Sequence, residues 1–271
     1  MVKKLLVVMM ALLMVCGCAN EENKDNVSTM TGKEKIIIAF GGNSDPFSFV
    51  KEVQGDYSVY CNSDQFLEGY DVRVARYLAS SLNKEIEAKK MNQQQGLEAL
   101  KNGEIDLYFN ALTSKDMIGV ASSDVYYEEE FSMVVLKDSK YAKYKEISKF
   151  AKKKVSSLKD SLAFECIAQI KNVKGDEGYA TYAEAVNALI AKDIDAIVAP
   201  TSVAKKFAAT NKDLKVLTFK EGKGFDKTIQ YVIAMDPNDA LEEEGLYQDV
   251  NKYIKQLDAE TAAEWMKQAL K

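Results

Sequence analysis

Short apolar runs alternate with amphipathic helical segments along most of the chain, and this alternation limits the folds open to it. The run KIIIAF ends at Gly41-Gly42, which is typical of a buried strand followed by a loop. The order expected from the periodicity is strand 35–40, a helix opening at Gly69-Tyr70-Asp71, strand 84–91, helix 94–102 and strand 105–109. Strands and helices at this spacing predict an α/β domain with a largely parallel sheet.

The second half of the chain resembles the first. Residues 96–110, GLEALKNGEIDLYFN, align with residues 185–199, AVNALIAKDIDAIVA, so a helix, a tight turn and a buried strand recur. An internal repeat and two convergent αβ units both explain this likeness, and both predict two α/β lobes. The apolar runs 131–136 and 231–235 are candidates for strands that cross between the lobes, and the tail 241–271 has a helical pattern.

Composition removes several classes of function. A net charge of −5 over 271 residues, without a basic stripe, gives no reason to expect nucleic acid as a partner. The chain has no histidine, which excludes Ser-His-Asp chemistry and most zinc sites. We expect no metal and no cofactor, and any catalysis would rest on carboxylates, Lys, Tyr or Cys.

The N-terminus has the pattern of an export signal. Lys3 and Lys4 precede an apolar stretch over 5–15, too short for a comfortable membrane span. The following VCGC resembles the lipobox of bacterial lipoproteins, with Cys18 as the lipidated residue. We expect a signal peptide over 1–17, a flexible tether over 18–33 and a protein held by lipid on the extracytoplasmic face of the cell membrane. An uncleaved anchor or a simple secreted signal is the alternative.

Two cysteines remain in the exported part of the chain, Cys61 and Cys166. They could form a disulfide, which would restrict a long loop. Two free thiols, or a buried small apolar residue, are the alternative.

Several segments in order resemble one family, the amino-acid-type (family 3) solute-binding proteins of bacterial ABC importers. The segments that carry the resemblance are KIIIAFGGNSDPFSF, EGYDVRVARYLASSL, LEALKNGEIDLYFNALTS, SSDVYYEEEFSMVVLKDS and TYAEAVNALIAKDIDAIVAPTSVAKKF. The resemblance implies a two-lobed, periplasmic-binding-protein type II fold that closes on a small solute. It also implies delivery to an ABC permease by a chain that is expected to be a monomer. The expected lobes are 34–132 with 222–271, and 133–221.

The residues that clamp an α-amino acid in this family are mostly replaced. The family's T-x-x-R segment reads Thr113-Ser114-Lys115-Asp116, with Asp116 at the arginine position and Lys115 available only in a shifted register. Pro200 stands where an aspartate holds the ligand amine. A ligand carboxylate about 4 Å from Asp116 would be repelled by about 4 kcal/mol at an effective dielectric near 20. Alternatively, Asp116 caps the next helix.

Most of the residues expected to line the cleft are uncharged hydrogen-bonding groups. They are Asn43, Ser44, Phe47, Gln93, Asn110, Thr113, Asp116, Ser161 and Thr201. Such a pocket favours a polar or cationic solute, for example an amine or a modified amino acid. The segment 54–68 is longer than the family's usual hairpin. It is a lid over the cleft, a surface for a partner, or a hairpin that packs its aromatic residues on the first lobe. The run YYEEE at 126–130 reads as solvated surface.

Three functions follow from these observations. The first is a solute-binding lipoprotein that delivers an amino acid, an amino-acid derivative or an amine to an ABC importer. The second is a binding or sensory module of the same fold without transport, which the altered clamp favours. The third is a dehydratase-like enzyme, which would need Asp116 or Glu165 as an acid in the cleft; we expect a binding protein rather than an enzyme.

Overall fold

The computed structural model describes residues 33–62 and 65–271. The expected signal peptide, the lipid site Cys18 and the tether as far as residue 32 lie outside the described residues. Among the residues that the structure does describe, no helix is both long enough and apolar enough to span a membrane.

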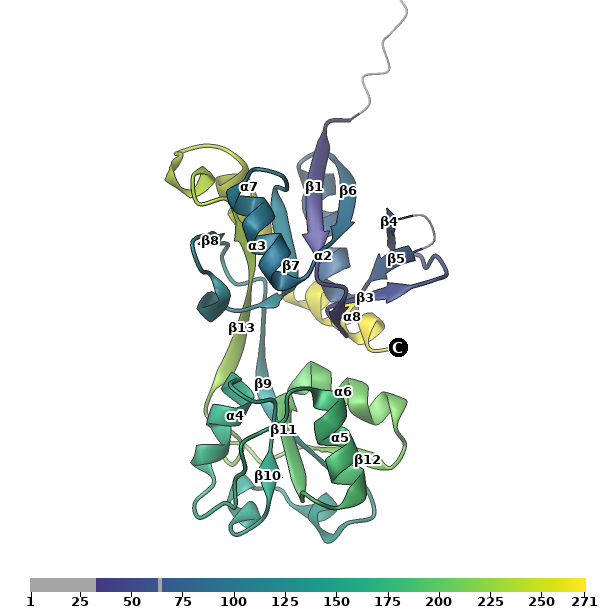
Figure 1. Ribbon diagram of the computed structural model, residues 1–271, viewed down its shortest axis with the longest axis vertical. Coiled ribbons are helices and arrows are strands. Elements are labelled where there is room, and N and C mark those ends of the chain that lie inside the picture. The colour runs from purple at the N-terminus through teal and green to yellow at the C-terminus, as the bar shows by residue number, and fades with distance from the viewer. Residues whose placement is uncertain (1–32, 63–64) are drawn as a thin grey trace, which may run out of the picture. The chain divides into compact units, whose positions relative to one another are not determined.

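A mixed β-sheet runs through the described chain (Figure 1). Its strands are β1 (Lys35–Phe40), β6 (Glu85–Lys90), β7 (Leu107–Leu112), β8 (Ala121–Ser122), β9 (Tyr127–Leu136), β10 (Val155–Ser156), β11 (Ala196–Pro200), β12 (Leu214–Leu217) and β13 (Thr228–Met235). The main order is β10-β11-β9-β13-β7-β1-β6, with β12 paired to β9 and β8 to β13. Each predicted strand is present within a few residues of its expected bounds.

The expectation of a largely parallel sheet is confirmed for β1, β6 and β7, the strands from which it was made, and is wrong for the sheet as a whole. Parallel pairing is confined to β1 with β6 and β7, and to β10 with β11. Strands β9 and β13 each run in the opposite direction to every strand with which they pair, so all of their pairs are antiparallel. The antiparallel pairs therefore come from the two strands that the sequence suggested as crossings.

Strands β9 and β13 connect two groups of elements. Residues 127–130 of β9 pair with residues 228–231 of β13. Beyond this point β9 pairs with β11 and β12, whereas β13 pairs with β7 and β8. We call the elements around β1, β6 and β7 the first lobe and those around β10, β11 and β12 the second lobe; Figure 1 shows the two long crossing strands running from one to the other.

Helices cover both faces of the sheet in each lobe. The first lobe has α2 (Tyr70–Ser81), α3 (Gln93–Lys101), α7 (Leu246–Gln256) and α8 (Ala259–Ala269), and the second has α4 (Leu162–Cys166), α5 (Tyr182–Ala191) and α6 (Thr201–Thr210). Leu97 and Leu100 of α3 pack with Ala39 and Tyr108, while the apolar face of α2 packs on the other side of the sheet. Burial of these faces leaves the loops at the strand ends to form a site.

Short 3-10 turns connect the larger elements. They are η1 (Ser114–Asp116), η2 (Lys140–Lys143), η3 (Ile147–Phe150), η4 (Ile167–Gln169) and η5 (Asp239–Leu241).

A small antiparallel sheet lies beside the first lobe, in the order β2 (Asn43–Ser44), β3 (Ser48–Lys51), β5 (Gln65–Glu68), β4 (Val59–Asn62). The long 54–68 segment supplies β4 and β5, and so forms a hairpin. Its aromatic rings are used locally: Tyr60 lies 5.8 Å from Phe66, and the Arg73 guanidinium lies 3.8 Å from the centre of the Tyr57 ring. The described residues of this segment therefore form a hairpin, as the hairpin alternative predicts.

The structure supports the alternative of two thiols for Cys61 and Cys166 and corrects the expectation of a solvated surface at residues 126–130. No disulfide joins Cys61 and Cys166 in the described chain: the Cys61 thiol donates to the carbonyl of Gln65 at 3.4 Å, and Cys166 is buried in α4. Burial raises the pKa of the Cys166 thiol to about 11. The YYEEE run is not solvated throughout, because Tyr126 and Glu129 are buried by contacts with residues far away in sequence.

Candidate ligand site

A cavity of about 590 Å³ lies where the carboxyl ends of β1, β7 and β11 meet the crossing strands. The first lobe contributes Asn43, Ser44, Asp45, Phe47, Asn110 and Ala111, the second contributes Leu158, Ser161, Leu162, Ala163, Ala180, Thr181, Tyr182, Ala183, Pro200, Val203 and Phe207, and the crossing strands contribute Phe131, Ile229 and Tyr231. The carboxyl ends of sheet strands are the usual place for ligands in α/β folds. The volume is that of a pocket for a small molecule.

The loop after β1 is built onto the end of β7. A Cβ on Gly41 would lie 1.9 Å from the Asn110 side-chain oxygen, so glycine is needed for this close approach. The Ser44 hydroxyl donates to the Asn110 Oδ1 at 2.7 Å. Because that oxygen already accepts a hydrogen bond, the amide NH₂ is the end of Asn110 best suited to meet a ligand.

A buried carboxyl holds the other side of β7. Ala111, which lines the cavity, has a left-handed φ of 49°, and its N–H donates to Asp71 Oδ2 at 3.3 Å. The Tyr126 hydroxyl donates to Asp71 Oδ1 at 2.6 Å. Complete burial raises the pKa of the Asp71 carboxyl to about 7, although both hydrogen bonds oppose the shift. Asp71 thus stabilises a strained residue in the cavity wall.

Aromatic rings form much of the remaining wall. The Phe47 ring centre lies 4.5 Å from that of Tyr231, and the Tyr182 ring centre lies 5.4 Å from that of Phe207. Phe131 also lines the cavity and is only 3% exposed. With the aliphatic lining residues, these rings make the cavity mostly apolar, with a few polar groups at its edge.

Asp45 is the only carboxylate among the lining residues, which include no lysine or arginine. Its Oδ1 lies 3.3 Å from the Lys206 ammonium, which comes from α6 in the second lobe. Burial raises the pKa of the Asp45 carboxyl, and the charge of Lys206 opposes that rise. The cavity therefore has one carboxylate, Asp45, which forms an ion pair with Lys206, a residue that does not line the cavity.

A second buried carboxyl, Glu129, ties the crossing strands to α6. It accepts hydrogen bonds from the Ser202 N–H at 2.6 Å, the Ser202 hydroxyl at 2.8 Å and the Tyr231 hydroxyl at 3.0 Å. Burial raises the pKa of this carboxyl, and the hydrogen bonds from Ser202 and Tyr231 oppose the shift. Glu129 thereby fixes Tyr231, a wall of the cavity, relative to the start of α6.

The structure brings together some of the residues expected at the site. Asn43, Ser44, Phe47, Asn110 and Ser161 line the cavity. The Ser161 hydroxyl has local partners, because it donates to the Leu158 carbonyl at 2.6 Å and accepts from the Phe164 N–H at 3.1 Å as the N-cap of α4.

Gln93, Thr113, Asp116 and Thr201 are not among the lining residues. Asp116 Oδ2 accepts from the N–H and the hydroxyl of Thr113, at 2.7 and 2.8 Å, and Oδ1 accepts from the Gln93 amide at 3.1 Å. Asp116 therefore forms a capping box with Thr113 at the turn η1, which agrees with the alternative that Asp116 is a helix cap. The Thr201 hydroxyl donates to the Glu130 carbonyl at 2.7 Å.

Sequence reasoning missed other lining residues, notably Asp45, Tyr182 and Phe207. Asp45 directly follows the candidate Ser44 and could have been found from that neighbour. Tyr182 and Phe207 lie on two different helices of the second lobe, and their helical spacing gave no sign that they meet at the cavity.

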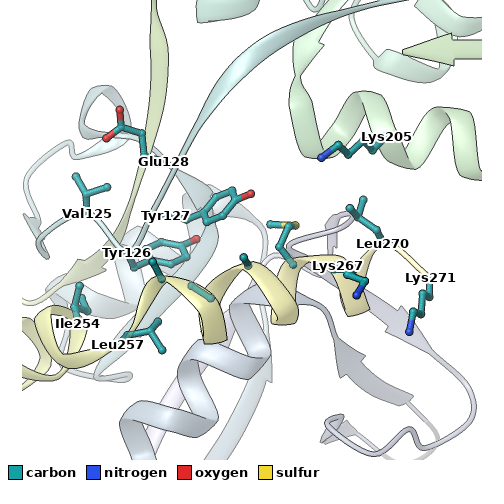
Figure 2. Close-up of a pocket in the computed structure, with 14 residues that line it drawn as sticks. Val125, Tyr126, Tyr127, Glu128, Lys205, Ile254, Leu257, Lys267, Leu270 and Lys271 are labelled. Carbon is teal, nitrogen blue, oxygen red and sulfur yellow. The ribbon is translucent and has the colours of Figure 1, made fainter. Parts of the chain in front are cut away.

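A second groove of about 1030 Å³ runs along α8. Figure 2 shows Tyr127 of β9 on one side, Lys205 of α6 opposite Leu270, and Lys267 and Lys271 at the end of the chain. Although larger, this groove lies along a helix side rather than at the strand ends. We therefore take the smaller cavity as the candidate ligand site.

Comparison with known proteins agrees with this geometry. The model of the bacterial extracellular solute-binding proteins, family 3, matches residues 36–270. The chain belongs to this family. The match includes both lobes, both crossing strands and every residue that lines the cavity.

Individual relatives of this family 3 protein are distant. It is 24% identical over 273 residues to the ABC transporter glutamine-binding protein GlnH of Bacillus subtilis, covering 92% of this chain and 94% of GlnH. It is 26% identical over 223 residues to the arginine-binding extracellular protein ArtP of the same organism, covering 78% and 76% of the two chains. Among solved structures, the arginine-bound substrate-binding protein AbpA of Streptococcus pneumoniae superposes with a TM-score of 0.63 at 23% identity, covering 87% of this chain and 94% of AbpA. These likenesses confirm the two-lobed fold of periplasmic-binding-protein type II.

Proposed function

We propose that this family 3 protein binds a small solute in the cavity at the ends of β1, β7 and β11 and delivers it to the permease of an ABC importer. The observation that carries the proposal is this cavity, with walls from both lobes and from both crossing strands. The names of GlnH and ArtP, a glutamine-binding and an arginine-binding protein, support an amino acid as the solute, and the altered clamp positions extend the proposal to an amino-acid derivative or an amine. A fold that can bend at two crossing strands suits capture and release.

The proposal extends to how the chain is held and divided. Residues 1–17 form a signal peptide, Cys18 carries the lipid and residues 18–33 form the tether. The lobes consist of residues 34–132 with 222–271, and of residues 133–221, in a monomer. The family description, extracellular solute-binding proteins, supports export, and the lipobox-like sequence before Cys18 supports the anchor.

A ligand-retention experiment tests the proposal. The mature protein is purified under native conditions. Its mass is then measured by mass spectrometry, once in the native state and once after unfolding in a denaturing solvent. We expect a small molecule to be released on unfolding, or a thermal shift with at least one solute in a panel of amino acids, their derivatives and amines. A protein that retains nothing and responds to nothing contradicts the proposal.

A binding module without transport is the second candidate. It is favoured by the clamp positions, because Asp116 is engaged in a turn and Pro200 presents no charge to the cavity. Uptake separates the two: deletion of the gene lowers uptake of the bound solute if the chain serves an importer, and leaves uptake unchanged if it serves as a sensor.

The dehydratase-like alternative needs an acid in the cavity. Neither Asp116 nor Glu165 lines it, and the one lining carboxylate, Asp45, lies 3.3 Å from the Lys206 ammonium. Glu165 is exposed on α4 and lies 2.8 Å from the Lys115 ammonium. No observation favours catalysis over binding.

A further inference from the structure

We propose that the cavity selects an organic cation with an apolar body and no carboxylate group, such as a primary amine. This inference rests on the proposed function and narrows the solute class at the same site.

No basic group is placed to receive a carboxylate. The lining residues include no lysine or arginine. Lys115, in the turn after β7, is outside the lining and lies 2.8 Å from Glu165. Lys206 lies 3.3 Å from Asp45. A carboxylate taken into this cavity would lose its hydration without gaining a charged partner, so its transfer from water is unfavourable.

Hydroxyl groups do not replace the missing cation. The hydroxyl of Ser161 both donates to Leu158 and accepts from Phe164. The Thr181 hydroxyl accepts from the Glu184 N–H at 3.2 Å, and the Ser44 hydroxyl donates to Asn110. The donors of Ser44 and Ser161 are therefore already used, and Thr181 keeps only one uncharged O–H donor, which does not replace a cation.

The same cavity offers two features that attract a cation. The Asp45 carboxylate lines it, and an incoming ammonium group can replace Lys206 as its partner. The faces of aromatic rings attract ammonium groups, and desolvation strengthens that attraction. Phe47, Tyr231, Tyr182 and Phe207 supply such rings from both lobes and a crossing strand.

The remaining lining explains the apolar body. Leu158, Leu162, Val203 and Ile229 present only carbon atoms from their side chains. A solute that buries methylene groups or a ring against them gains affinity in proportion to the apolar surface removed from water. A small, fully polar solute would leave this surface without a partner.

Matched solute pairs test the inference by isothermal titration calorimetry. The pairs are phenylalanine with 2-phenylethylamine and leucine with 3-methylbutylamine, in which the members differ only by the carboxylate, and 3-phenylpropionate serves as the anion-only control. We expect at least one amine to bind tenfold or more tightly than its amino acid, and no binding of 3-phenylpropionate. An amino acid that binds as tightly as its amine, or more tightly, overturns the inference.

Charge variants test the role of Asp45. Asp45→Asn is expected to weaken amine binding at least tenfold, and Lys206→Met to strengthen it because the competing ammonium is removed. Asp56→Asn changes an exposed acid of the same lobe and is expected to leave the affinity within twofold. Circular dichroism confirms that each variant is folded. Equal amine affinity in Asp45→Asn and the wild type overturns the assignment.

Mass spectrometry of the retained solute distinguishes a failure of this inference from a failure of the proposed function. A retained amine without a carboxylate supports the inference even when the panel compounds bind weakly. A retained carboxylate-bearing solute overturns the inference but leaves the proposed function intact. A protein that retains and binds nothing overturns both.

Discussion

The Lys115 ammonium lies 2.8 Å from the Glu165 carboxylate and joins the turn after β7 in the first lobe to α4 in the second. Glu165 also lies 3.5 Å from Lys227. Lys115 is thus occupied by a protein carboxylate and is not free to bind a ligand carboxylate. The side chains of Lys115 and Glu165 are 62% and 46% exposed, so solvent screens the pair.

Lys115→Met tests whether this lysine contacts the solute. Because it lies outside the lining and its ion pair is exposed, we expect solute affinity within threefold of wild type and a free energy of unfolding close to that of wild type. Calorimetry and urea unfolding measure the two quantities. A tenfold loss of affinity in Lys115→Met, with no loss in Glu165→Gln, would show that Lys115 is a ligand contact.

Asp71 predicts a pH dependence of stability. Its pKa of about 7 in the folded protein exceeds the ordinary value of 3.8, so between these values the folded state binds a proton that the unfolded state has lost. The contribution of this bound proton to the free energy of unfolding is complete below about pH 4. It is lost as the pH rises toward 7, at about 1.4 kcal/mol per pH unit.

Asp71→Asn removes that dependence. Urea unfolding at pH 4.5, 5.5 and 6.5 should show the stability of the wild type falling relative to the variant as the pH rises. Asp56→Asn, at an exposed site, is the control and should leave the trend of the wild type unchanged. A difference between wild type and Asp71→Asn that stays constant or grows with pH contradicts the assignment.

Glu129→Gln tests the link between the crossing strands and α6. An amide in place of the carboxylate leaves at least one of the donors from Ser202 and Tyr231 facing an NH₂ group or without its acceptor. We expect a loss of about 1–3 kcal/mol in the free energy of unfolding. Glu128→Gln, at the exposed neighbouring position, is the matched control and should change stability little. Equal stability of the two variants would remove the role given to Glu129.

Local patterns predicted the elements, whereas distant contacts determined the details of the site. The period of apolar residues located α2, α3 and the crossing strands because burial of one face leaves that pattern in the sequence. Glu129 looked solvated in the run YYEEE, yet its partner Ser202 lies 73 residues away. Only the folded chain reveals such a contact.

Asp116 shows a second limit. Its sequence position allowed either a reversed charge in the cleft or a cap, and the hydrogen bonds to Thr113 and Gln93 favour the cap. The chemistry of the site then depends on Asp45, whose role follows from Lys206 on a helix of the other lobe. Asp45 and Asp116 are both aspartates in loops that follow strands, so their type and sequence position did not indicate which of them lines the cavity.

Cys18→Ala tests the proposed anchor. Lipidation requires this thiol at the mature N-terminus, so we expect the variant to lose labelling by a radioactive fatty acid and to appear in the soluble fraction. Cys16→Ala changes the neighbouring cysteine and should keep both the label and the membrane association. Loss of label in Cys16→Ala alone would move the anchor to Cys16, and loss in neither would contradict lipidation.

The most direct measurement is a crystal structure of the mature protein with its solute, either retained through purification or added from the panel. We expect electron density for the solute in the cavity, in contact with Phe47, Asn110 and Tyr231 and with the Asp45 carboxylate. Density in the groove along α8, with the cavity at the strand ends empty, would contradict it.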